Sequence, residues 1–70
     1  MRSKDDIYND HLEMFKDAVV ILGSFPRSEI TTVLLQEGLT AAEVMQLVSD
    51  LKRTPEIKEQ GAFLVYTGRP

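Results

Sequence analysis

The chain has 70 residues, no cysteine, 43% hydrophobic residues and a formal net charge of −3. A chain of this length forms one small domain at most, and without cysteine it has no disulfide framework, thiolate nucleophile or sulfur-ligated zinc site. The acidic balance argues against a nucleic-acid binder, because phosphate contacts need clustered lysine and arginine.

The first helix is predicted over residues 4–22. Ser3 suits the N-cap, and aspartates follow it where the positive end of the helix dipole favours acids. Apolar residues recur at helical spacing in a stripe that Met14, Ala18 and Ile21 widen toward the C-terminal end, which we expect to be the more deeply buried end. A buried strand over the β-branched residues 19–21 is the alternative. The helix is favoured because its pattern begins several turns earlier and Gly23 supplies a stop.

Two further helices are predicted over residues 27–37 and 41–53, and they meet at a tight corner. Gly38 suits the left-handed position just past a helix end. Thr40 and Glu43 form a capping-box pattern, in which each side chain accepts a hydrogen bond from the backbone of the other residue. Stop and start signals therefore meet within a few residues, and this corner should be the best-specified point of the fold.

A short fourth helical turn is predicted over residues 55–60, because Thr54 suits the cap and Pro55 the first helical position. Residues 62–66 are rich in strand formers and should be extended. A lone strand is unstable in water, so this segment should lie on the helices, pair with residues 57–59 in a hairpin, or pair with another chain. The predicted fold is mainly α: a compact three-helix bundle with a fourth turn and an extended C-terminal segment.

The sequence offers no pattern for catalysis or for a cofactor. His11 is the single histidine, whereas a metal site needs several convergent ligands. Ser24 and Ser28 lie in no nucleophile-elbow pattern, and the four glycines stand at turns or helix ends rather than in a phosphate-binding motif. We therefore expect no enzyme activity, no cofactor and no metal.

A row of acids marks the first helix. Its members fall at spacings that place them along one stripe; they are Asp6, Asp10, Glu13 and Asp17. One interpretation is a solvated face that keeps the protein soluble. The other is a docking face for a basic protein partner.

The corner at Gly38 also fits the spacing of a DNA-binding helix-turn-helix, with the C-terminal extended segment as a wing. In that interpretation the residues near DNA would be Thr40, Ala41, Gln46, Ser49, Lys52 and Arg53. The second helix of the corner would also expose Glu43 and Asp50, and its bases stand at its far end. Helices that read a DNA groove normally present Arg, Lys, Asn or Gln near their start.

Phe63 and Val65 are further candidates for contact with a partner. Their segment could add as an edge strand to a partner protein or to a second copy of the chain, which would give a homodimer. Burial in the protein's own core is the alternative, because small domains need their apolar residues inside.

The predicted function is that of a small non-enzymatic regulatory, adaptor or inhibitor protein that binds another protein through the acidic face of the first helix. A helix-turn-helix transcription regulator is the alternative, with nucleic acid the less favoured partner. Residues 1–70 are treated as one domain, with residues 1–3 and 68–70 as disordered ends. A cytoplasmic location is expected, because no signal segment is apparent and the apolar run at residues 18–22 is too short to cross a membrane.

Overall fold

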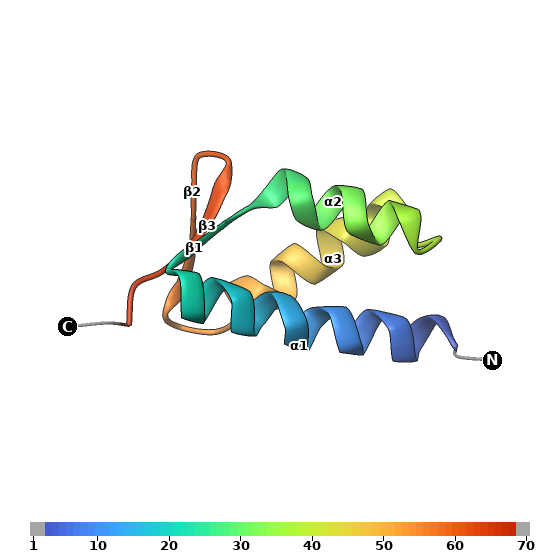
Figure 1. Ribbon diagram of the computed structural model, residues 1–70, viewed down its shortest axis with the longest axis horizontal. Coiled ribbons are helices and arrows are strands. Elements are labelled where there is room, and N and C mark those ends of the chain that lie inside the picture. The colour runs from blue at the N-terminus through green and yellow to red at the C-terminus, as the bar shows by residue number, and fades with distance from the viewer. Residues whose placement is uncertain (1–2, 69–70) are drawn as a thin grey trace.

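The structure is a computed structural model that describes residues 3–68 and contains three helices and three short strands (Figure 1). In chain order the elements are α1 (Lys4–Leu22), β1 (Ser24–Pro26), α2 (Arg27–Gln36), α3 (Ala41–Lys52), β2 (Ile57–Gln60) and β3 (Phe63–Tyr66). The bounds of the three helices agree with the predicted ranges to within one residue. Of the ends predicted to be disordered, residues 1–2 and 69–70 lie outside the described part of the chain.

The predicted fold class was wrong, because the helices share the fold with a three-stranded antiparallel sheet. The strand order is β1-β3-β2, and the sheet lies at one end of the helices (Figure 1). The expected fourth helical turn over residues 55–60 is instead a turn that leads into β2. β2 pairs with β3 from Ile57 opposite Tyr66 to Gln60 opposite Phe63. Nucleating one isolated helical turn is unfavourable, whereas the ladder satisfies the backbone groups of both strands.

The N-terminal end of α1 is capped as predicted, and its two buried residues, Phe15 and Val19, lie in the C-terminal half, but the last turn is exposed. Ser3 Oγ accepts a hydrogen bond of 3.2 Å from the Asp6 backbone N–H. At the other end, Ile21 and Leu22 are 69% and 66% exposed. Gly23, with φ of 85°, turns the chain sharply into β1. The sheet therefore covers one side of the last turn and leaves these two side chains in solvent.

The corner between α2 and α3 is confirmed. Gly38 has φ of 88°, a conformation that glycine adopts without steric cost, and the Leu39 N–H donates to the Leu34 carbonyl at 3.0 Å. The capping box is complete: the Glu43 N–H donates to Thr40 Oγ1 at 3.2 Å, and the Thr40 N–H donates to Glu43 Oε1 at 2.9 Å. Orphan backbone groups at both helix ends are thus satisfied.

The core joins all three helices to the sheet. Its buried side chains are Phe15, Val19, Ile30, Leu34, Leu39, Val44, Leu47, Val48, Leu51, Ile57 and Leu64. Among residues 3–68 no polar or charged side chain is buried. The charged residues therefore lie at the surface, where they are available for contact with other molecules.

Candidate functional site

The four predicted acids lie on the side of α1 that is turned away from the core. The side chains of Asp6, Asp10, Glu13 and Asp17 are all exposed. They follow one another along the helix and do not converge on a point. Within residues 3–68 no group of three His, Cys, Asp or Glu residues is arranged to hold a metal. The four carboxylates therefore present negative charge along the length of α1.

Exposed apolar side chains border this row of acids. Met14 and Ile21 are 48% and 69% exposed. Each follows an acid of the row by four residues, Met14 after Asp10 and Ile21 after Asp17, and residues at this spacing are neighbours on a helix surface. We call these two apolar residues and the four acids the α1 acidic face. The sequence prediction placed Met14 and Ile21 in the buried stripe, because periodicity does not separate the edge of that stripe from its centre.

His11 has a structural role on the other side of α1. Its Nδ1 donates a hydrogen bond of 2.8 Å to the Ile7 carbonyl one turn earlier. Its ring centroid lies 6.0 Å from that of the buried Phe15. The imidazole thus covers the edge of the core.

The residues predicted to lie near DNA occur on the exposed side of α3 and at its ends. Met45, with 69% exposure, lies between them. Thr40 is held in the capping box. The Gln46 amide donates to Asp50 Oδ1 at 3.1 Å on the same helix. The side chains of Thr40 and Gln46 are therefore already hydrogen-bonded within the protein, and an exposed apolar side chain, Met45, lies among the predicted residues.

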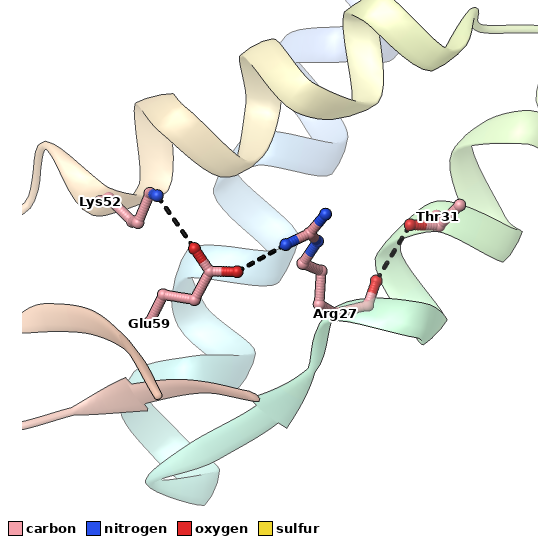
Figure 2. A network of polar contacts seen from close by, with 4 residues as sticks. All are labelled: Arg27, Thr31, Lys52 and Glu59. Carbon is pink, nitrogen blue, oxygen red and sulfur yellow. Dashed lines mark hydrogen bonds and ion pairs between the residues drawn. The ribbon is translucent and has the colours of Figure 1, made fainter. Parts of the chain in front are cut away.

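The basic side chains near this surface are paired with acids. Glu59 on β2 bridges two of them: Arg27 Nη1 lies 2.7 Å from its Oε2 and Lys52 Nζ lies 3.0 Å from its Oε1 (Figure 2). At the end of α3, Arg53 Nη1 lies 3.7 Å from Asp50 Oδ1. The hydrogen bonds from Lys52 and then Arg27 hold the pKa of Glu59 below its usual value. A DNA phosphate would have to compete with these internal carboxylates.

A hollow of about 250 Å³ opens between α3, the start of α2 and β2. We call it the α3–β2 groove. It is lined by Arg27, Val44, Met45, Val48, Ser49, Lys52 and Glu59. The sequence prediction missed this groove because it treated residues 55–60 as helical, and the groove exists only because β2 lies beside α3.

The strand that carries Phe63 and Val65 is the middle strand of the sheet. β3 is hydrogen-bonded to β1 on one edge and to β2 on the other. β3 therefore has no free edge, and it cannot add to a partner strand as predicted from the sequence. Leu64 points into the core, and Phe63, which is half exposed, lies on the opposite side of the sheet. Contact with a partner through the Phe63 and Val65 side chains stays a prediction.

No protein family, curated protein or solved structure matches the chain. Within residues 3–68 no helix has both the length and the apolar character needed to cross a membrane. The functional proposal therefore depends on the surfaces of α1 and α3.

Proposed function

We propose that this protein is a small non-enzymatic binding module that docks onto a basic protein through the α1 acidic face. The observation that supports this proposal is the placement of exposed Met14 and Ile21 beside the row of acids. A solvated face needs only the acids. Apolar side chains at their border add area that a partner can cover, and apolar patches rimmed by polar residues are typical of protein interfaces.

The two kinds of side chain would contribute differently to binding. The carboxylates would attract a basic partner over a distance of about 8 Å in physiological salt and would speed association. Met14 and Ile21 would contribute to affinity by leaving water, at about 25 cal/mol per Å² of apolar area. Such a module would act in the cytoplasm as a regulator, adaptor or inhibitor, because its effect would come from occupying part of its partner's surface.

A helix-turn-helix DNA-binding protein is the second candidate. The α2–α3 corner is followed directly by the β2–β3 hairpin, which occupies the position of a wing. Against this candidate, the turn of that hairpin consists of Gly61 and Ala62 and carries no base. Lys52 and Arg53 are paired with Glu59 and Asp50, so a phosphate would have to compete with these carboxylates for both bases.

The test is a capture experiment from native lysate, with and without nuclease, followed by purification of the retained partner. The Asp10→Lys, Asp17→Lys variant should lose this partner, and capture by the unchanged protein should weaken as salt is raised. The Glu37→Lys, Glu56→Lys variant is the matched control, because it changes the net charge equally on other exposed positions. It should retain the partner. Circular dichroism checks that both variants are folded.

Three outcomes decide between the candidates. Loss of the partner in the α1 variant alone supports docking through the α1 acidic face. Equal binding by both variants removes this proposal. Capture that disappears after nuclease treatment favours the DNA-binding candidate instead.

A further inference from the structure

We propose that the α3–β2 groove is a second binding site, which takes a peptide segment of a partner protein with an apolar side chain next to a carboxylate. This proposal goes beyond docking through the α1 acidic face and is independent of it, because the two surfaces share no residue. It follows from the size of the groove, its apolar wall and the positions of its charges.

The size of the groove suits side chains rather than a whole cofactor. Its volume of about 250 Å³ lies below the range of about 300–1,000 Å³ that is usual for small-molecule sites. Val44 and Val48 form its floor, and Met45 stands beside it in solvent. Methionine is flexible and polarizable, so it adapts to apolar groups of different shapes. An apolar side chain that enters the groove would pack on Val44 and Val48 and would shield Met45 from water.

The charges at the rim suit an anionic group. The side chains of Arg27 and Lys52 are 52% and 42% exposed, whereas that of Glu59 between them is 23% exposed. The two cations are therefore more exposed than the acid, and Glu59 lies between them (Figure 2). Arginine has five N–H donors and lysine three, and each side chain uses one of them on Glu59. Both residues line the groove and are partly exposed, so a carboxylate that enters the groove can accept hydrogen bonds from their remaining donors.

A peptide fits this combination better than a nucleic acid. A phosphodiester backbone would use the cations but would leave the apolar floor and Met45 without a partner. An acidic peptide with a neighbouring leucine or phenylalanine uses both. Nucleic acid is therefore the competing outcome of the test below.

Replacing Glu59 tests this proposal, because the direction in which peptide affinity changes depends on the charge of the peptide. Its carboxylate occupies the same two cations that an incoming carboxylate would use, so it acts as an internal competitor. Replacing Glu59 by glutamine should strengthen binding of an acidic peptide. The same change should weaken binding of a basic peptide, for which Glu59 would be the attractive group.

The experiment titrates the full chain, labelled with ¹⁵N, with a short synthetic peptide of leucine and glutamate in a glycine–serine background. Matched peptides replace glutamate by lysine or leucine by serine, and a short DNA duplex is titrated separately. Amide shifts caused by the leucine–glutamate peptide should gather at Arg27, Met45, Ser49 and Glu59. Both matched peptides should bind more weakly, because each lacks one of the two required groups.

Variants then test the assignment. Lys52→Gln should weaken binding about two- to fivefold, the range expected for one exposed ion pair, and Met45→Ser should weaken it as well. Glu59→Gln should tighten binding, whereas Glu37→Gln, just after the end of α2, should not change it. The dispersion of the amide spectrum checks that each variant is folded. Preference for the lysine peptide or the duplex, shifts located elsewhere, no binding of any probe, or weaker binding by Glu59→Gln would each overturn the proposal.

Discussion

The Tyr8 hydroxyl donates a hydrogen bond of 2.5 Å to Asp50 Oδ2 and so joins α1 to α3. The same carboxylate accepts a hydrogen bond from Gln46 and pairs with Arg53. Asp50 therefore holds the two helices together and also neutralises a base at the end of α3. Its position connects the packing of the domain to the charge of the surface on which the DNA-binding candidate depends.

Replacing Tyr8 by phenylalanine should lower the free energy of unfolding. The variant keeps the ring but removes a hydrogen bond to a charged acceptor, a loss of about 1.5–3 kcal/mol. Urea denaturation followed by circular dichroism measures this change. Tyr66→Phe is the matched control and should cost less, because the Tyr66 hydroxyl makes no hydrogen bond within residues 3–68. An equal loss in both variants would show that the contact with Asp50 contributes little.

The same contact predicts a loss of stability at alkaline pH. Burial, and then the hydrogen bond to Asp50, raise the pKa of Tyr8 well above its ordinary value of 10.0. The folded state thus prefers the protonated phenol. This contribution is complete below pH 10.0 and declines as the pH rises from there toward the pKa of the folded state. Urea midpoints measured at about pH 8 and about pH 11 should therefore differ less in Tyr8→Phe than in the unchanged protein.

At acidic pH, two glutamates should contribute to a loss of stability. The pKa of Glu43 is lowered by the Thr40 backbone N–H, and that of Glu59 by Lys52 and then Arg27. Each contribution is present above the ordinary glutamate pKa of 4.5 and is lost as the pH falls through the lower pKa of the folded state.

Glu59→Gln is the variant that checks this acid dependence. Glutamine is uncharged, so the melting temperature of the variant should fall less between about pH 6 and about pH 3 than that of the unchanged protein. Solvent screens these exposed groups, and the difference should be small. Glu37→Gln should follow the unchanged protein. A Glu59→Gln curve parallel to that of the unchanged protein would remove the bridge as a source of the acid dependence.

The helices were predictable because their signals are local. Gly38 and the Thr40–Glu43 capping box mark the ends of α2 and α3 within a few residues, and no distant contact changes their meaning. β2 has no such signal. Lys58, Glu59 and Gln60 are not strand formers, and they are extended because β3 lies beside them. Pairing between strands depends on tertiary contacts, which the local sequence does not give. The local signal at Pro55 instead favoured the start of a helix.

The candidate sites likewise divide into features set by local sequence and features set by tertiary contacts. The acids of α1 were found from their spacing, because helix geometry alone places them on one stripe. The exposure of Met14 and Ile21 depends on where the neighbouring elements end, which periodicity does not give. The α3–β2 groove and the bridge through Glu59 depend on the position of a strand that was predicted to be helical.

Leu64 and Val65 provide the sharpest check of the sheet. Leu64 is fully buried on the side of β3 that faces the helices, and Val65 lies on the other side. Leu64→Ala should therefore cost about 2–5 kcal/mol through lost burial and a residual cavity. Val65→Ala should cost clearly less, because its side chain is partly in solvent. Urea denaturation of both variants measures the difference. A larger loss for Val65→Ala would mean that β3 presents its opposite side to the core, since a shift of one residue in a strand exchanges its two faces.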